Sequence, residues 1–152
     1  MTCRLGSAKI SRGKSWRLFL VADTQVLVWY VREPSRLTKV AVEALENATA
    51  NGDVIGVSAF SIVELVYATE KVTNPISLDD FDTIKSVLND PASPFQVIEL
   101  DDEIAFRVAL VPRLSNADPG DRIIVATAEV LGLPLVSSDS KIPGMTSLLV
   151  IR

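Results

Sequence analysis

Short apolar segments alternate with helix-like segments along most of the chain. Strands are expected at residues 19–22, 54–57, 95–100, 133–136 and 148–151, and helices at residues 24–31, 36–50, 61–71, 77–89, 101–114 and 119–131. The helix over residues 101–114 should be interrupted late by Pro112. No hairpin signal joins two neighbouring strands, so strands that are connected through helices should lie parallel. The pattern predicts an α/β fold, namely a three-layer α/β/α domain with a central, mostly parallel sheet.

Capping residues set the expected helix boundaries. Ser35 is expected to cap the helix over residues 36–50, and Ser61 begins the next one with capping-box spacing to Glu64. Asp118 is expected to cap the helix that starts at Pro119, which should stop at Gly132.

Length and composition indicate one globular domain. The chain has 152 residues, of which 48% are hydrophobic, and this suits a sheet covered on both faces. The longest apolar stretch, residues 18–31, is interrupted by Asp23 and Gln25 and is shorter than the roughly 20 residues of a membrane span.

One cysteine, Cys3, allows no intrachain disulfide, so we expect a cytoplasmic protein. The absence of histidine excludes histidine bases and histidine zinc sites.

Charge is distributed unevenly. Residues 1–17 carry five cations and no acid, and we expect them to form a flexible basic extension. The rest of the chain is acidic, which argues against a protein that holds nucleic acid mainly by neutralising phosphates. A nuclease that uses metal ions escapes this objection, because bound cations reverse the local field.

Four acids fall where the predicted sheet should have its functional edge. Asp23 and Asp139 follow two of the predicted strands, and Glu64 and Asp121 are expected in the first turns of their helices. Ligands of parallel sheets bind beyond the carboxyl ends of the strands. Each acid taken singly could be a helix cap or a turn residue, but Asp23 lies in an apolar stretch and needs a partner.

Crowded carboxylates are costly. Two unit charges 4 Å apart repel by about 4 kcal/mol at an effective dielectric of 20. No lysine or arginine partner is evident in the sequence, and oxygen ligands alone favour Mg²⁺ or Mn²⁺. Such ions activate water and stabilise charge on a phosphate undergoing cleavage. The acids therefore predict metal-dependent phosphodiester hydrolysis.

Four segments resemble the motifs of PIN domains, especially those of VapC toxins. They are Phe19-Leu-Val-Ala-Asp23-Thr-Gln-Val-Leu-Val-Trp-Tyr, Val57-Ser-Ala-Phe-Ser-Ile-Val-Glu64-Leu, Asp118-Pro-Gly-Asp121-Arg-Ile-Ile-Val-Ala-Thr-Ala and Gly132-Leu-Pro-Leu-Val-Ser-Ser-Asp139. The resemblance covers residues 18–152, which it identifies as a PIN domain. Many relatives carry a histidine just before the third motif, where this chain has Ser115-Asn116-Ala117.

The resemblance implies a Mg²⁺- or Mn²⁺-dependent endoribonuclease. Asp23, Glu64 and Asp121 would be the core metal ligands, and Asp139 a further acidic member. Supporting roles are open at three further positions: Thr24 and Ser137 bind ligands or waters or only begin a helix or turn, and Asp118 is a helix cap or a ligand. We expect Trp29 and Tyr30 to be core or interface aromatics rather than platforms for bases.

The resemblance also implies partners. A VapC-type toxin would cleave RNA, form a homodimer and be silenced by a small antitoxin. Two alternatives remain at this point: a housekeeping PIN nuclease in RNA maturation without an antitoxin, and a catalytically degenerate PIN module that only binds partners.

Overall fold

A computed structural model of the protein describes residues 17–114 and 118–152. Within these residues five strands form one sheet: β1 (Leu18–Ala22), β2 (Val54–Ser58), β3 (Phe95–Ile98), β4 (Leu135–Val136) and β5 (Val150–Ile151). Their order is β3-β2-β1-β4-β5, and every neighbouring pair is parallel. The predicted parallel sheet is confirmed.

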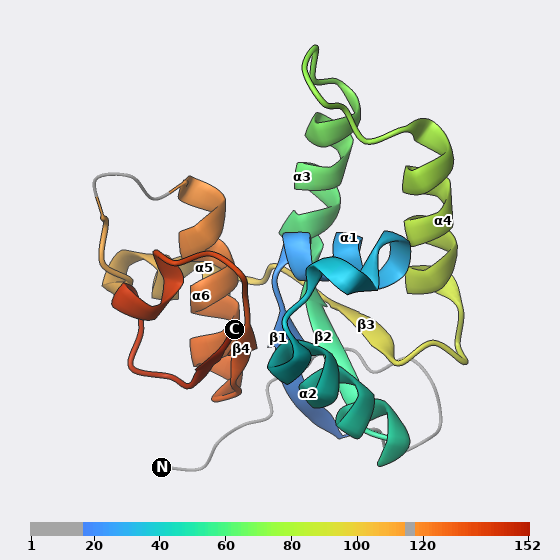
Figure 1. Ribbon diagram of the computed structural model, residues 1–152. Coiled ribbons are helices and arrows are strands. Elements are labelled where there is room, and N and C mark those ends of the chain that lie inside the picture. Colours follow the sequence, from blue (N-terminus) through green and yellow to red (C-terminus); the bar gives the residue numbers. More distant parts are fainter. Residues whose placement is uncertain (1–16, 115–117) are drawn as a thin grey trace.

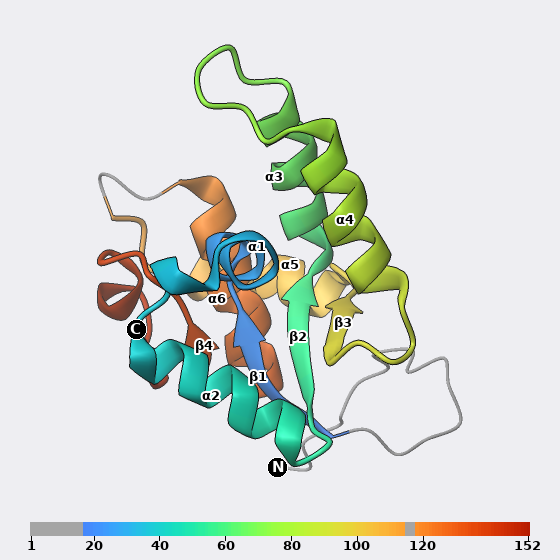
Figure 2. The ribbon, with the colours of Figure 1, turned by 45° about the vertical axis from the view of Figure 1, so that its right-hand side comes forward.

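Helices cover both faces of this sheet. They are α1 (Thr24–Arg32), α2 (Lys39–Ala50), α3 (Ala59–Thr69), α4 (Leu78–Asn89), α5 (Asp102–Arg107) and α6 (Pro119–Leu131), with short 3-10 turns η1 (Pro34–Arg36), η2 (Val108–Leu110) and η3 (Ile142–Gly144). Helices α5 and α6 lie on one face, and α1, α2 and α4 lie on the other, while α3 continues upward from β2 beside α4 (Figures 1 and 2). The predicted three-layer α/β/α architecture is therefore confirmed.

The central strand β1 joins two apolar cores. Leu20 and Ala22 belong to the core beneath α1 and α2, whereas Val21 belongs to the core beneath α6. All three side chains are fully buried, because successive strand residues point to opposite faces and both faces are covered. This double burial fixes the register of β1 and so fixes where its carboxyl end delivers the next residue, Asp23.

Two predicted helix starts were wrong. Ser35 caps nothing in the structure: Pro34 opens the turn η1, Leu37 turns its side chain into the core with an extended backbone, and α2 starts after Thr38. The Thr38 hydroxyl accepts a hydrogen bond from the Ala41 amide at 3.1 Å.

Helix α3 begins two residues before the predicted Ser61. Ser58 is its N-cap and accepts a hydrogen bond from the Phe60 amide at 3.1 Å. Ser61 lies inside the helix and is fully buried. The predicted capping box between Ser61 and Glu64 therefore does not form.

Prolines shorten two further elements. The helix predicted over residues 101–114 ends as α5 at Arg107 and a single 3-10 turn, because Pro112 forces Val111 into an extended conformation. The strand predicted from Leu133 begins only at Leu135, although the carbonyl of Pro134 still accepts a hydrogen bond from β1.

The predicted N-terminal extension, with Cys3, and the segment Ser115–Ala117 lie outside the described residues, apart from Arg17. The Arg17 carbonyl accepts a hydrogen bond from the Val54 amide at 2.8 Å, which ties Arg17 to the start of β2. None of the helices in the described part of the chain has the length and apolar character to cross a bilayer.

Candidate active site

Asp23 is the N-cap of α1 and follows β1 directly. Its Oδ1 accepts hydrogen bonds from the amides of Gln25 (2.7 Å) and Val26 (3.3 Å), and its Oδ2 accepts one from the Ser137 hydroxyl. The residue is only 7% exposed. Burial raises the pKa of this carboxyl, and its three hydrogen bonds act in the opposite direction. Because Asp23 lies in an apolar stretch, it needs hydrogen-bond partners, and it finds them in the backbone of α1 and in Ser137.

Glu64 lies in the second turn of α3, not in the first turn as predicted, because the helix starts earlier. Thr24 Oγ1 is 3.2 Å from Glu64 Oε1 and 2.7 Å from Ser61 Oγ. Thr24 can therefore donate to the carboxylate while it accepts from Ser61. Burial, followed by repulsion from Asp118 and other nearby acids, raises the pKa of Glu64 to about 7. The hydroxyl pair holds in place a carboxyl group that is readily protonated.

Asp121 occupies the third position of α6 and forms a reciprocal capping box with Asp118. The Gly120 amide donates to Asp118 Oδ1 at 2.9 Å, and the Asp118 amide donates to Asp121 Oδ2 at 3.2 Å. Burial, with repulsion from Asp139 as the next cause, raises the pKa of Asp121. The cap predicted for Asp118 is confirmed, and the same bonds orient Asp121.

Asp139 follows β4 across a turn that Ser137 organises. The Ser137 hydroxyl accepts from the Asp139 amide at 3.1 Å and donates to Asp23, so one side chain links two of the acids. Lys141 was not foreseen as a partner, yet its Nζ lies 3.6 Å from Asp139 Oδ2 and 3.9 Å from Asp121 Oδ2. These separations describe a loose ion pair on one side of the cluster.

Gly120 allows α6 to approach α3 closely. A Cβ atom at this position would lie 2.8 Å from Phe60 Cε1 and 3.0 Å from Glu64 Oε1. Any side chain would force the Phe60 and Glu64 side chains or the start of α6 to shift. The glycine in Asp118-Pro-Gly-Asp121 therefore brings Asp121 toward Glu64, a role that the linear spacing alone did not reveal.

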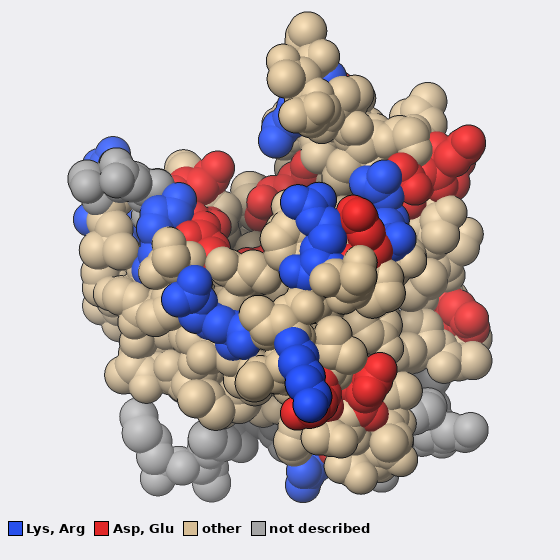
Figure 3. Space-filling model, viewed as in Figure 1, with Lys and Arg blue, Asp and Glu red and all other residues tan. Residues whose placement is uncertain are grey.

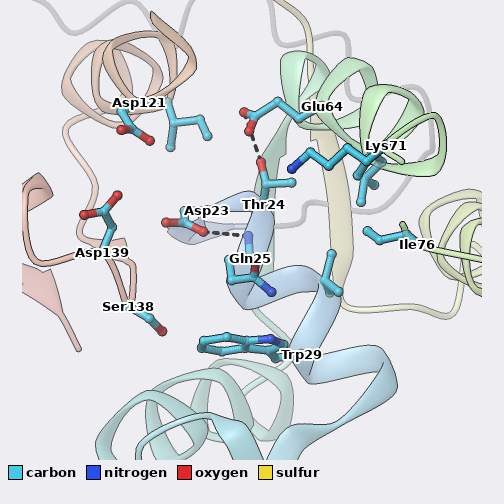
Figure 4. Close-up of a pocket in the computed structure, with 14 residues that line it drawn as sticks. Asp23, Thr24, Gln25, Trp29, Glu64, Lys71, Ile76, Asp121, Ser138 and Asp139 are labelled. Atoms are coloured by element: carbon cyan, nitrogen blue, oxygen red, sulfur yellow. Dashed lines mark hydrogen bonds between the residues drawn. The ribbon is translucent and has the colours of Figure 1, made fainter. Parts of the chain in front are cut away.

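The four acids share one cavity of about 430 Å³. Its lining at the carboxyl edge of the sheet comprises Asp23, Thr24, Glu64, Asp121, Ser138 and Asp139. Figure 4 shows the four carboxylates around a common space, with Asp121 and Asp139 on one side and Asp23 and Glu64 facing them. The structure thus brings the four predicted acids together. Among the supporting positions, Thr24 lines the cavity, whereas Ser137 lies buried behind it.

The chemistry of these donors suits a divalent cation. All four are carboxylates, which are ligands that Mg²⁺ and Mn²⁺ prefer, and burial together with repulsion between the acids raises the pKa of three of them, Asp23, Glu64 and Asp121. As the side chains stand, no three acids in residues 17–114 and 118–152 form a group that holds one ion. The donors fit such an ion in kind, and binding it requires them to close in from the cavity wall.

A parallel α/β/α sheet with a four-carboxylate cleft at the carboxyl ends of its strands is the class of protein that these observations define. Residues 20–146 match the model of the PIN domain, and the chain belongs to the PIN domain family. It is 28% identical over 123 residues to ribonuclease VapC22 of Mycobacterium tuberculosis, a match that covers 81% of this chain and 88% of that protein.

Two solved structures show the same fold. One is the DNA-bound VapBC of Salmonella typhimurium, with a TM-score of 0.63 and 17% identity, covering 88% of this chain and 96% of that chain. The other is a toxin–antitoxin complex from Klebsiella pneumoniae, with a TM-score of 0.53 and 20% identity, covering 84% of this chain and 96% of that chain. The resemblance that the motifs indicated is confirmed at the level of family and fold.

Proposed function

We propose that this protein is a Mg²⁺- or Mn²⁺-dependent endoribonuclease and the toxin of a toxin–antitoxin pair. The observation that carries the proposal is the convergence of Asp23, Glu64, Asp121 and Asp139 on one cavity. Similarity to a protein named ribonuclease VapC22 supports the nuclease class and RNA as the substrate.

The proposed metal ligands are Asp23, Glu64 and Asp121, with Asp139 as a further acid. A bound ion would supply activation of water and stabilisation of negative charge on the phosphate. Hydrogen bonds orient two of the acids before an ion binds: Ser137 orients Asp23, and Thr24 orients Glu64. Closing on the ion then remains as the rearrangement, and donors oriented before the reaction are a main source of rate enhancement.

The toxin assignment rests on the solved structures that share this fold. One structural neighbour is a toxin–antitoxin complex, and others are VapBC assemblies. By analogy we assign this chain a small antitoxin that silences it, a homodimeric state and a place of action in the cytoplasm.

Purified protein incubated with structured RNA provides the first test. We expect cleavage with Mg²⁺ or Mn²⁺, none with EDTA, and loss of cleavage in Asp121→Asn by orders of magnitude in rate. Asp101→Asn is a matched control. Asp101 is an acid at the start of α5, as Asp121 is at the start of α6, but Asp101 does not line the cavity. Cleavage that survives in Asp121→Asn contradicts the catalytic assignment, and failure of the wild type with either metal indicates a binding module.

Expression in a bacterium tests the toxin assignment separately. The wild type should arrest growth, Asp121→Asn should not, and a small neighbouring reading frame should rescue growth when co-expressed. Normal growth with active, uninhibited enzyme would assign the protein to RNA maturation instead.

A further inference from the structure

The cleft extends well beyond the acids along one face of α1. Gln25, Val28 and Trp29 all line it, and their spacing of three and four residues places them on the same side of the helix. Asp23 caps this helix, and six residues of helix advance about 9 Å along its axis. The acids at the start of α1 and the indole of Trp29 are therefore two ends of one continuous wall, as Figure 4 shows.

The opposite wall comes from α3 and the residues after it. Leu65 and Ala68 follow Glu64 along the side of α3 that faces the cleft, and Lys71 and Ile76, from the segment after α3, complete the wall. This wall is apolar apart from the Lys71 side chain, whose amino group points toward Thr24 and Glu64 in Figure 4.

Trp29 differs from its neighbour Tyr30. Tyr30 packs edge-on against Phe95, with ring centroids 5.4 Å apart, and belongs to the core as predicted. Trp29 also packs partly against the core, but it borders the cavity, and the Arg36 guanidinium lies 4.6 Å from its ring centroid. The Arg36 side chain also forms an ion pair with Glu33 at 3.6 Å and remains 55% exposed. An aromatic ring and an exposed cation thus stand together beside the acids.

The distribution of charge suits a polyanion whose backbone passes an acidic centre. Figure 3 shows acidic side chains within the hollow and basic side chains around it. Phosphates that do not bind at the acids need cations, which Lys71 in the cleft wall and Arg36, the ion-pair partner of Glu33 beside Trp29, provide. A base attached to such a phosphate needs a flat apolar surface, and stacking on aromatic rings is how proteins hold unpaired bases.

We propose that Trp29 is a specificity-determining residue that binds the base of one unpaired nucleotide next to the scissile phosphate. Gln25 stands between Asp23 and Trp29 and offers an amide donor and acceptor to the edge of that base (Figure 4). Lys71 contacts the neighbouring phosphate. The inference rests on the proposed ribonuclease function and adds a substrate class to it: RNA with a single-stranded nucleotide at the cleavage site, read through its base.

A binding measurement without metal tests this subsite apart from catalysis. The sequence has two tryptophans, so Trp16→Phe leaves Trp29 as the reporter of fluorescence. In EDTA, a short single-stranded RNA containing a cleavage site should quench this fluorescence, whereas the same RNA in a duplex should not. An abasic residue at one position of the strand should abolish the quenching, and Trp29→Leu should weaken RNA binding roughly 5- to 150-fold, the range for losing one stacked base.

Cleavage by the wild type provides the second arm. An abasic site moved along the RNA should slow cleavage at one position, and Trp29→Leu should remove the difference between abasic and intact RNA there. Trp29→Phe should retain most of it, because a ring remains. Tyr67→Leu is the control, since Tyr67 is an exposed aromatic of α3 that does not line the cavity.

The outcomes separate the two proposals. If RNA is cleaved but Trp29→Leu changes the effect of the abasic site at no position, the subsite is wrong and the ribonuclease assignment stands. If no RNA is cleaved but Trp29 is still quenched by single-stranded RNA, the ribonuclease assignment fails and the subsite stands. If Trp29→Leu weakens only the binding of an antitoxin, the wall is a protein-docking surface and the inference is wrong. Should Trp29→Leu fail to fold, quenching and the abasic series on proteins that retain Trp29 decide the question.

Discussion

Raising the pH of the metal-free protein should destabilise it, and replacing Glu64 with Gln should remove a defined part of that loss. The pKa of Glu64 rises from an ordinary 4.5 to about 7 in the folded state. Between these values the folded state holds a proton that the unfolded state has released. The free energy of unfolding therefore falls as the pH rises through this window and levels off above about pH 7.

The magnitude follows from the two pKa values. A group that titrated at 4.5 unfolded and 7 folded would change the free energy of unfolding by at most about 3.4 kcal/mol. Glu64 is partly exposed, and solvent screening reduces this to about 1–2 kcal/mol. For a chain of this size, the loss corresponds to a decrease of about 2–8 °C in Tm. Asp23 and Asp121 also have raised pKa values, so a smaller slope should remain in Glu64→Gln.

Thermal melts in EDTA from pH 5 to pH 8.5 measure the effect. The difference in Tm between Glu64→Gln and wild type should grow in favour of the variant as the pH rises toward 7. Glu70→Gln is the matched control, because Glu70 ends α3 but does not line the cavity. Parallel curves for Glu64→Gln and wild type would refute the reasoning, since Glu64 would then carry the same charge in both states throughout.

Three further changes probe the framework of the site. Asp23→Asn keeps an oxygen that can cap α1, so it should leave the metal-free Tm equal or higher while reducing the rise in Tm with Mg²⁺; an unfolded variant would make Asp23 mainly structural. Asp118→Ala should cost about 1 kcal/mol of stability through loss of its cap, which urea denaturation measures, and unchanged stability would contradict the capping role. Gly120→Ala should weaken Mg²⁺-induced stabilisation by moving α6 away from α3, and adding Phe60→Leu should restore part of it; a response equal to that of the wild type would show that the close approach does not matter.

The sheet and most helix boundaries could be predicted because their signals are local. Burial on both faces of a strand leaves a continuous apolar run, and caps such as Ser77, Asp118 and Gly132 are decided by bonds within one turn. The acids could be placed at one edge because parallel strands end together. These inferences need only the order of elements along the chain.

The remaining features depend on contacts that no local pattern contains. Ser58 and Ser61 are equally good caps by type, and the choice follows from the contact of Ser61 with Thr24, which is 37 residues away. Lys141 meets Asp121 only because the turn after β4 folds back toward α6. The positions of Gln25 and Trp29 in the cleft wall could have been predicted from the sequence, because both follow the Asp23 cap on one side of the same helix.

The position of Asp23 as both helix cap and buried acid has a genetic consequence. The two duties depend on different properties of one side chain: capping needs an oxygen, whereas holding a cation needs a negative charge. Asparagine keeps the first and loses the second. Inactivation at this position therefore requires neither truncation nor an unfolded product, and an Asp23→Asn allele would yield an intact chain. Such an inactive chain would still compete with the active chain for its binding partners. The allele would therefore be dominant rather than recessive.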